Sequence, residues 1–418
     1  MSWPGPEIDP DRAVVISGIG LATALGPTRD ATWAAIRAGR SGARLLAATH
    51  PDLAGYAGFP LDGSSRHGGT EPAVGLARTL AVAALADAGL RRPGLEPDRV
   101  GVLVGLSKGG LQALGTARSL TGRAGDGRGR DEAALARAWG LVGPDAAASA
   151  IARDLDLRGP CLAPVAACAT GLVAALQGAD LIRHGVCDVA LVGSADLSLD
   201  PLVLGAFRRM KVLARVDGDP IDAVRPWGRD RSGFLVGEGG AILVLERLGA
   251  VRARGASAYA ELAGGALGSD AHHETGLDPD PAGLARVIAR ALDRAAVDPV
   301  DVAAVNVHGT ATGPNDPLEC RALRRAFGSH ADRLAIAASK AQVGHLLGAA
   351  GSVELALTAL AVRDGFAPPT LNLDDPDPAC DLDATPHRGR ALAIPAALKL
   401  SLGFGGHLAA AVLRRIPD

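Results

Sequence analysis

The chain has 418 residues, of which 48% are apolar and 21% are charged, as in an ordinary soluble globular protein of one or more large cores. A formal net charge of −2 argues against nucleic-acid binding, which usually needs a basic field. The longest apolar stretch, 346–362, contains Glu354 and predicts a buried helix, so we expect no membrane span.

The start of the chain lacks the basic and apolar regions of a secretory signal. Its five cysteines are scattered and lack the paired spacing of metal ligands, so we expect free thiols and no metal site. These features favour a reducing compartment and predict a cytoplasmic protein.

Short apolar runs and longer helical patterns alternate along the chain, which favours an α/β architecture with helices covering sheets. After a polar stretch at 1–11, the first half predicts strands at 14–17, 100–104 and 188–193 and helices at 28–39, 73–88 and 172–184. The glycine- and arginine-rich stretch 118–131 predicts a mobile surface loop. The second half predicts helices at 284–295 and 346–362 and strands at 302–307, 334–337 and 409–413. We therefore expect two similar halves, 1–255 and 256–418.

Cys168 is a candidate nucleophile because of its place in the pattern. The segment 164–171 reads Pro-Val-Ala-Ala-Cys-Ala-Thr-Gly and leads into the helix predicted at 172–184. Unpaired backbone N–H groups and the positive end of the helix dipole both favour a thiolate at this position. The alternative is a small apolar residue packed in a core, which is the usual fate of a free cysteine.

Two histidines lie at the ends of predicted elements, where α/β proteins present side chains to a cleft. His308 follows the strand at 302–307, and His345 comes just before the helix that contains Glu354. Neighbouring glycines allow backbone and ligand to approach each histidine closely. Lys340 lies in the same segment as His345. Each histidine alone is more readily explained as a structural imidazole, but together with Cys168 and Lys340 they indicate a catalytic set.

Together these segments resemble the β-ketoacyl-acyl-carrier-protein synthase family, whose members have the thiolase fold. The resemblance covers nearly the whole chain and includes the segments 16–20, 167–171, 225–239, 308–316, 339–351 and 403–406. It implies two similar halves in a layered α-β-α-β-α arrangement. The Cys-His-His set resembles the elongating branch, since initiating synthases have Asn in place of the second histidine and thiolases use a second cysteine.

The resemblance also implies a reaction. Cys168 would hold the acyl chain as a thioester, and His308 and His345 would stabilise the enolate formed when a malonyl thioester loses carbon dioxide. The backbone N–H groups of Cys168 and Phe404 would form the oxyanion hole, and Phe404 would also gate the second substrate. Lys340 would order the His345 region, with Glu354 as a partner. In supporting roles, Asp316 and Glu319 would hold the His308 loop or pair with cations.

The chain departs from the family pattern at the position of the acyl tunnel. The segment 105–110 reads Gly-Leu-Ser-Lys-Gly-Gly, which places Lys108 where relatives have an apolar residue. Since an unpaired ammonium beside a long alkyl chain is costly, one hypothesis is a short, polar or acidic acyl substrate. The alternative is that Lys108 turns its ammonium toward solvent or a partner subunit.

The segment around the C-terminal glycine motif also departs from the pattern. Leu400 and Leu408 stand where relatives have asparagines, and His407 takes the place of the usual threonine. Trp227 replaces the usual phenylalanine. These departures put the substrate in question more than the reaction.

The reaction implies an acidic acyl-carrier protein as partner, which delivers both substrates on phosphopantetheine, and no other cofactor. Arg208, Arg209 and Lys211 form the best candidate docking cluster, although a solvated helix face explains them nearly as well. The fold implies a dimer, either homomeric or with a related subunit. The function we expect is condensation in fatty-acid or polyketide-type biosynthesis, with the departures favouring the latter. The alternatives are a non-elongating subunit that resembles a chain-length factor, or an acyltransferase without decarboxylation.

Overall fold

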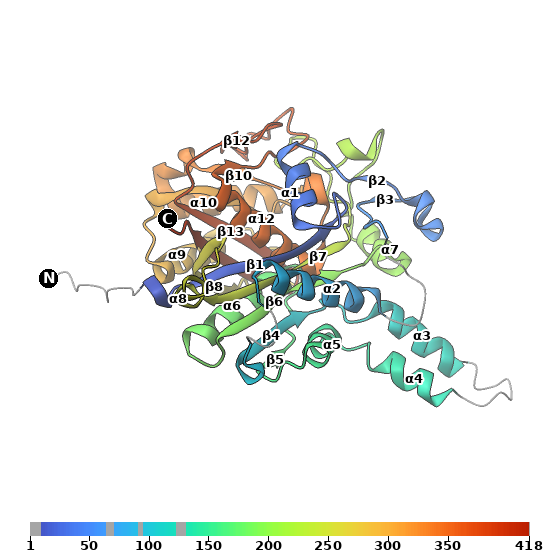
Figure 1. The fold of residues 1–418 in the computed structure, drawn as a ribbon. Helices are drawn as coiled ribbons and strands as arrows, with labels where there is room; N and C mark the ends of the chain where they lie inside the picture. Colours follow the sequence, from blue (N-terminus) through green and yellow to red (C-terminus); the bar gives the residue numbers. More distant parts are fainter. Residues whose placement is uncertain (1–9, 64–70, 91–94, 123–130, 418) are drawn as a thin grey trace.

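The structure is a computed structural model of the chain, and it describes residues 10–63, 71–90, 95–122 and 131–417. One large mixed sheet runs through the molecule (Figure 1). Its ten strands are β1 Val14–Thr23, β4 Val100–Gly105, β5 Cys161–Leu162, β6 Val189–Asp196, β7 Gly239–Arg247, β8 Ala260–Ser269, β9 Val302–Asn306, β10 Ala335–Ala337, β13 Ala396–Gly403 and β14 His407–Arg414.

The sheet contains the same five-stranded pattern twice. The first half of the chain gives the order β5-β4-β6-β7-β1, and the second half gives β10-β9-β13-β14-β8. In each set the first two pairs are parallel and the next two are antiparallel. The sets join where β1 pairs with β8 in antiparallel register. The two halves of the chain therefore repeat one topology.

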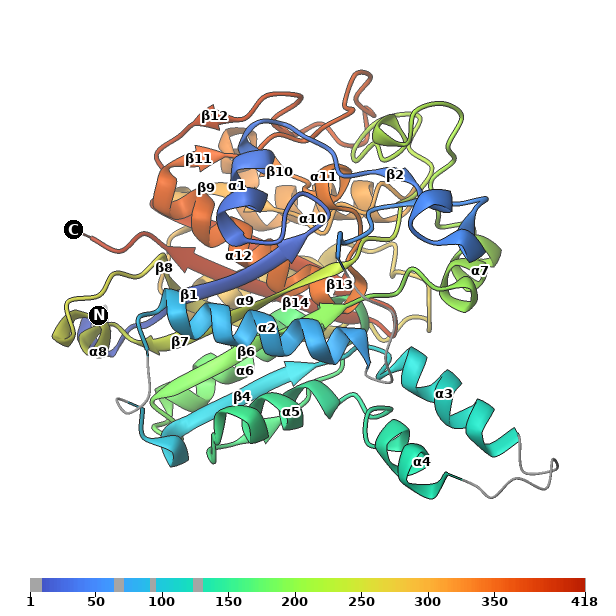
Figure 2. The same ribbon diagram turned by 45° about the vertical axis from the view of Figure 1, so that its right-hand side comes forward.

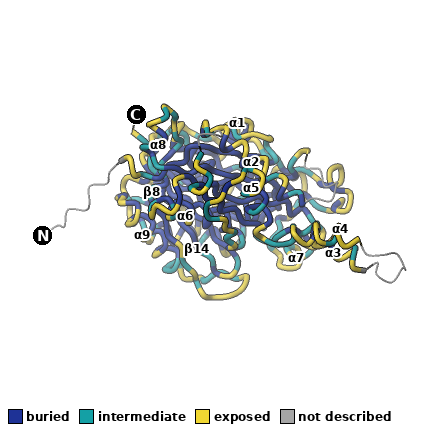
Figure 3. The backbone as a smooth tube through the Cα atoms, turned by 60° about the horizontal axis from the view of Figure 1, so that its bottom comes forward, coloured by how far each residue is buried: buried dark blue, intermediate teal, exposed yellow. Residues whose placement is uncertain are grey.

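Helices divide the fold into layers. The central layer is α6 Thr170–Arg183 and α12 Ala350–Asp364, which are buried almost all round and belong to the core shared by both halves. The first half is covered by α2 Pro72–Asp87 and α5 Ala146–Leu155, and the second by α9 Ala282–Ala295 and α10 Asn315–Phe327. Figure 3 shows the buried centre and the exposed outer helices. The expected α-β-α-β-α arrangement is confirmed.

The two central helices meet at their N-terminal ends through a pair of glycines. A Cβ atom at Gly171 of α6 would lie 2.6 Å from the backbone nitrogen of Ser352, and one at Gly351 would lie 2.5 Å from that of Leu172. Only glycine allows backbones to approach this closely. The contact brings the turn that contains Cys168 against the helix that contains Glu354.

Of the remaining helices, α11 Lys340–Val343 is fully buried, and the others are partly exposed. Thr28 caps the first of them, accepting a hydrogen bond from the backbone N–H of Ala31. The helices are α1 Arg29–Arg37, α3 Leu111–Gly122, α4 Glu132–Trp139, α7 Pro201–Arg209, α8 Leu248–Ala253 and α11 Lys340–Val343, and the short strand pairs are β2 Arg44–Leu45 with β3 Ala57–Gly58 and β11 Phe366–Ala367 with β12 Arg390–Ala391.

The predicted loop at 118–131 is wrong as far as Gly122, because α3 continues to that residue. Asp131 caps α4 by accepting from the backbone N–H of Ala134, and α3 and α4 project together from the body (Figure 2). The rest of that loop, 123–130, and most of the polar stretch at 1–11 lie outside the described residues.

The helix predicted at 346–362 begins later, at Ala350, because Leu347–Ala349 form a 3-10 turn. The first strand is longer than predicted and continues to Thr23, paired with β7. Across the described residues, no helix combines the length and apolar character needed to cross a membrane.

Candidate active site

Cys168 lies in a short 3-10 turn, Ala167–Ala169, directly ahead of α6. The turn begins with a left-handed residue, since the φ angle of Ala167 is 46°. Thr170 holds this backbone: its hydroxyl accepts from the N–H of Ala166 at 2.9 Å and donates to the carbonyl of Ala167 at 2.8 Å. The strained turn places the cysteine at the N-terminal end of α6, as the sequence pattern predicts.

The thiol of Cys168 is 9% exposed, and burial raises its pKa to about 11. Positive charge on Lys108 and Lys340 acts in the opposite direction. The expectation of a thiolate at this helix start is therefore wrong for the free protein, because desolvation of the charged form outweighs the favourable charges. The resting residue is a thiol that must lose its proton as it reacts.

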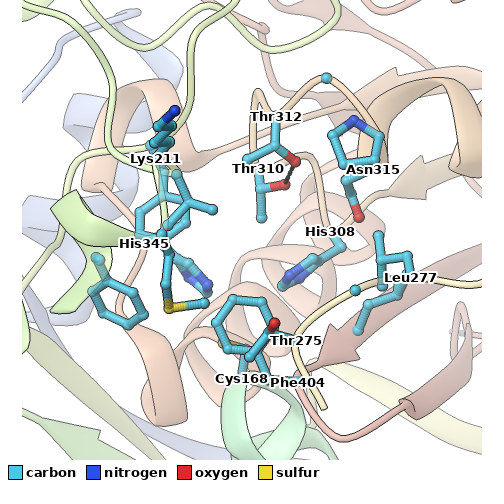
Figure 4. Close-up of a pocket in the computed structure, with 18 of the residues that line it drawn as sticks. Cys168, Lys211, Thr275, Leu277, His308, Thr310, Thr312, Asn315, His345 and Phe404 are labelled. Atoms are coloured by element: carbon cyan, nitrogen blue, oxygen red, sulfur yellow. Dashed lines mark hydrogen bonds between the residues drawn. The ribbon is translucent and has the colours of Figure 1, made fainter. Parts of the chain in front are cut away.

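His308 and His345 face each other across the same pocket. His308 follows β9 by two residues, and His345 follows α11 after a glycine. Their ring centroids are 5.3 Å apart with the ring planes at 82°, and Phe234 packs edge-on against His345 at 4.7 Å. In Figure 4 the two rings turn their nitrogen atoms toward each other above Cys168.

Both imidazoles are neutral near pH 7. Burial lowers the pKa of His308 well below its ordinary value, and the charge of Lys340 lowers it further. Burial and the charges of Lys340 and Lys108 act in the same direction on the pKa of His345. A neutral imidazole has one N–H donor and no net charge, which suits it to hydrogen bonding with an oxygen atom that becomes negative.

The three side chains share a pocket of about 380 Å³. Its lining combines apolar side chains with hydroxyl, amide and basic groups, several of which are labelled in Figure 4. Besides Cys168, His308 and His345, the lining includes Phe207, Met210, Lys211, Val212, Arg231, Phe234, Leu277, Thr310, Thr312, Asn315 and Phe404.

Phe404 reaches this pocket because Gly403 packs directly on the nucleophile turn. A Cβ atom at Gly403 would lie 2.5 Å from the carbonyl oxygen of Ala166 and 3.2 Å from the backbone nitrogen of Cys168. The ring of Phe404 is partly exposed at the pocket wall and lies 6.4 Å from the ring of Phe207. The turn between β13 and β14 therefore lies directly beside Cys168.

Lys340 and Glu354 form a fully buried ion pair at 2.6 Å. The Lys340 ammonium also donates a hydrogen bond to the backbone carbonyl of His308, so it reaches the His308 strand as well as its own segment. Glu354 has a second cationic partner, Lys399 of β13, at 2.7 Å. Sequence reasoning missed Lys399, although a single lysine in the apolar run 396–402 was a visible signal.

The two acidic residues of α10 hold different parts of the site. Glu319 accepts from the backbone N–H groups of His308 at 2.6 Å and Gly309 at 2.7 Å. Asp316 accepts from the backbone N–H of Trp227 at 2.9 Å and also from the backbone N–H of Ala311 in the His308 loop. Burial raises the pKa of both carboxyls, that of Glu319 to about 7. Both acidic residues therefore hold the His308 loop, Glu319 at its start and Asp316 at Ala311.

Lys108 is exposed, as the solvent alternative predicts, and its ammonium is also paired. Its ammonium lies 2.8 Å from the carboxylate of Asp196 and donates to the hydroxyl of Ser107 at 2.8 Å. Asp196 is almost fully buried and also accepts from the backbone N–H of Gly348 at 3.1 Å and from Ser198. Around this pair the open space is only about 10 Å³.

Arg208, Arg209 and Lys211 lie together at the C-terminal end of α7 and just beyond it, and all three are exposed. The guanidinium of Arg208 stands over the ring of Tyr56 at 5.8 Å. Lys211 also lines the pocket, so this basic cluster reaches from the surface to the pocket mouth.

A duplicated α/β fold with a buried cysteine at a helix start, facing two neutral histidines, defines a thiol-dependent acyltransferase of the thiolase fold. Residues 61–250 match the family described as "Beta-ketoacyl synthase, N-terminal domain", and residues 259–374 match "Beta-ketoacyl synthase, C-terminal domain". The chain belongs to the β-ketoacyl synthase family.

Two curated relatives illustrate the kinds of protein to which the chain is similar. The chain is 37% identical to the tetracenomycin polyketide synthase ketoacyl synthase alpha subunit of Streptomyces glaucescens, over 97% of each chain. It is 34% identical to 3-oxoacyl-[acyl-carrier-protein] synthase 2 of Coxiella burnetii, over 97% of this chain and 99% of the relative.

Solved structures show the same fold. A chain in the complex of a type II PKS acyl-carrier protein with its hexaketide-bound ketosynthase matches with a TM-score of 0.88 and 29% identity, covering 97% of this chain and all of that one. A chain of the ishigamide ketosynthase/chain length factor matches with a TM-score of 0.87 and 31% identity, with the same coverage. The relatives thus include both 3-oxoacyl-[acyl-carrier-protein] synthases and polyketide ketosynthases.

Proposed function

We propose that this chain is a β-ketoacyl-acyl-carrier-protein synthase that joins an acyl group held on Cys168 to a malonyl group by decarboxylative Claisen condensation. The observation that carries the proposal is the shared pocket, in which a buried thiol faces two neutral imidazoles. The family and its relatives support the same reaction.

In the first step, the sulfur of Cys168 attacks the carbonyl carbon of an acyl thioester on the carrier protein. The bond to the phosphopantetheine sulfur breaks, and that sulfur takes up the proton that Cys168 loses. In this proposal the backbone N–H groups of Cys168 and Phe404 form the oxyanion hole that stabilises the negative oxygen of the intermediate. The product is an acyl-enzyme thioester.

In the second step, malonyl thioester enters the vacated pocket. The bond between its carboxylate and the adjacent carbon breaks, carbon dioxide leaves, and the electron pair forms an enolate. The N–H groups of His308 and His345 donate to the thioester oxygen as it becomes negative. Neutral donors suit this step, because an imidazolium would also attract the malonyl carboxylate and stabilise the ground state.

In the third step, the enolate carbon attacks the acyl carbonyl on Cys168. A carbon–carbon bond forms, the sulfur leaves as thiolate, and the β-ketoacyl chain remains on the carrier protein. Since the side chains of the pocket supply the nucleophile and the hydrogen-bond donors, we propose that no resident metal or cofactor takes part.

The partner we propose is an acyl-carrier protein, docked on Arg208 and Arg209 so that its phosphopantetheine passes Lys211 into the pocket. The cluster lies at the pocket mouth and is positively charged, which suits an acidic partner. A related ketosynthase has been solved in complex with its acyl-carrier protein.

We further propose that the chain forms a homodimer through β5, with a related subunit as the alternative. β5 is an edge strand of the large sheet, and Leu162 and Val165 beside it are 45% and 48% exposed. Such an apolar edge is suited to pairing with another chain.

All five cysteines are free, which supports a reducing, cytoplasmic compartment.

Among pathways, we favour polyketide-type biosynthesis. Several of the relatives are polyketide ketosynthases of Streptomyces species, and the residues at Lys108 and Leu400 depart from the fatty-acid pattern.

The test is to mix the enzyme with acyl-carrier protein loaded with acyl and malonyl groups and to follow both proteins by mass spectrometry. We expect an acyl adduct on Cys168 and a β-ketoacyl carrier protein. Cys168→Ala abolishes the adduct, whereas Cys161→Ala, which removes the exposed cysteine, retains it. Acylation without loss of carbon dioxide supports the simple acyltransferase instead. If the protein is not acylated and no carbon dioxide is lost, the result supports a chain-length-factor-like subunit.

A further inference from the structure

Lys399 is a fully buried cation in the middle of an apolar strand. Its neighbours on β13, Leu398 and Leu400, pack in the core of the second half, so the alternation of the strand turns Lys399 to the opposite face, toward α12. Burying an ammonium is costly unless it is paired. The position therefore requires an explanation that packing alone does not give.

The partner of Lys399 is the same carboxylate that pairs with Lys340. The Lys399 ammonium lies 2.7 Å from one oxygen of Glu354, and the Lys340 ammonium lies 2.6 Å from the other. Glu354 is thus held from both sides. With two ammonium groups and one carboxylate, this buried cluster retains one positive charge.

Both lysines also reach the backbone that carries His308. Lys340 donates to the carbonyl of His308 itself, and the Lys399 ammonium lies 3.5 Å from the carbonyl of Val307. Lys399 also stands beside this segment in the sheet, since it is paired with Asn306 in the parallel register of β13 and β9. The cluster therefore fixes the C-terminal end of β9, from which the chain continues to His308 in the pocket.

We propose that Lys399 is a positioning residue of the condensation reaction, which clamps Glu354 opposite Lys340 and so holds the His308 backbone for decarboxylation. This role rests on the proposed function and deepens it. Lys399 does not line the pocket among the described residues and touches no substrate, so it acts through Glu354 and the β9 backbone.

The clamp has an electrostatic consequence. The charge of Lys399 adds to that of Lys340 in lowering the pKa of both histidines, whose first cause is burial. Burial lowers the pKa of Lys399 itself to about 8, so its ammonium form prevails below that pH. The charged or titratable groups that surround the histidines are Cys168, Glu319, Lys340, Glu354, Lys399 and the Lys108–Asp196 pair.

The test measures decarboxylation of malonyl-carrier protein and acylation of Cys168 as functions of pH. Lys399→Met removes the cation at nearly constant length. We expect kcat for decarboxylation to fall about tenfold with KM unchanged, while the acylation rate stays within about threefold. The acid limb of the decarboxylation profile shifts to higher pH, because the histidines of the variant accept protons more readily.

Two further variants separate charge from packing. Lys399→Arg keeps the cation, and its acid limb stays at the position of the unmodified enzyme. The double variant Lys399→Met with Glu354→Gln restores one net positive charge through Lys340, and its acid limb returns toward that position although kcat stays low. Circular dichroism and Tm report whether each variant folds. If Lys399→Met does not fold, the position of the acid limb in Lys399→Arg is the test of the charge.

A Lys399→Met variant with an unchanged rate and an unchanged acid limb overturns the role of Lys399, as does an equal loss of acylation and decarboxylation. A shifted acid limb in Lys399→Arg overturns it as well. An unmodified enzyme that neither decarboxylates malonyl-carrier protein nor condenses overturns the proposed function instead, so the two failures are distinguishable.

Discussion

The imidazole rings of His308 and His345 stand edge to face with centroids 5.3 Å apart, although one follows a strand of the large sheet and the other follows α11. Their proximity gives a substrate oxygen two N–H donors from different elements. Burial and nearby lysines lower the pKa of both rings, so both imidazoles are neutral. Each neutral ring already has one N–H donor and does not need to take up a proton first.

Replacing either histidine with alanine removes one of the two donors to the enolate. We expect His308→Ala and His345→Ala each to lower the rate of malonyl decarboxylation by about 100-fold, the usual effect of losing one such donor. Acylation of Cys168 does not create this enolate and stays within about tenfold of the original rate. Single-turnover mass spectrometry of the acyl-enzyme and the carrier protein measures both steps.

A control at Phe234 shows whether packing around the ring explains the loss. Phe234→Leu retains both imidazoles but removes the edge-on ring contact to His345. It should cost far less than either histidine variant. Equal losses in all three proteins would contradict the donor role.

The reactivity of Cys168 toward a small alkylating reagent should rise steeply with pH. Its thiol has a pKa of about 11 in the free protein, so the thiolate fraction grows tenfold per pH unit between pH 7 and 10. Iodoacetamide labelling followed by peptide mass spectrometry measures this dependence. A plateau already reached near pH 7 would mean that the helix start outweighs burial.

Reversing charge in the basic cluster should weaken the encounter with the carrier protein. We expect Arg208→Glu and Arg209→Glu to raise KM for acyl-carrier protein about tenfold with little change in kcat, and the effect to diminish at high salt. Arg290→Glu, on the exposed face of α9 at the other side of the molecule in Figure 1, is the matched control. Equal effects at Arg208 and Arg290 would place the docking site elsewhere.

Periodicity in the sequence predicted the α/β class, the two similar halves and the candidate nucleophile, because it records burial and helix starts directly, whereas the α-β-α-β-α layers were implied by the resemblance to the family. Cys168 at the start of α6 and His308 after β9 follow from those patterns. The ionisation state of Cys168 could not be predicted, because it depends on desolvation by residues distant in the chain.

The partners of the buried charged residues could not be predicted from the sequence either. Glu319 and Asp316 are neighbours on α10, yet Glu319 holds the start of the His308 loop, whereas Asp316 joins Ala311 of that loop to Trp227. Lys399 joins Glu354 only because β13 lies against α12 in the folded chain. The loop predicted at 118–131 was misjudged because its glycine and arginine content conceals the last turns of α3.

If Lys108 stands at the acyl tunnel, as the resemblance to the family implies, its ion pair with Asp196 should restrict the acyl chain. The cavity beside the pair has a volume of only about 10 Å³ and is not lined by Cys168, whereas the pocket that holds Cys168 has about 380 Å³ and is not lined by Lys108. A long alkyl chain would have to displace the ammonium from Asp196 and leave the carboxylate without its cation, which is costly. The unmodified enzyme should therefore load short acyl groups faster than long ones.

Lys108→Met removes the cation while retaining most of the side-chain length. Asp196 keeps its hydrogen bonds from Ser107, Ser198 and the backbone of Gly348, so we expect the variant to fold with a lowered Tm. Its acylation by long-chain carrier protein should rise relative to short-chain carrier protein by about tenfold, because an apolar wall replaces an ammonium. Competition between two-carbon, eight-carbon and carboxylated acyl-carrier proteins, read by mass spectrometry, measures the change. A long-chain preference already present in the unmodified enzyme would mean that the acyl chain leaves Cys168 by a path that avoids Lys108.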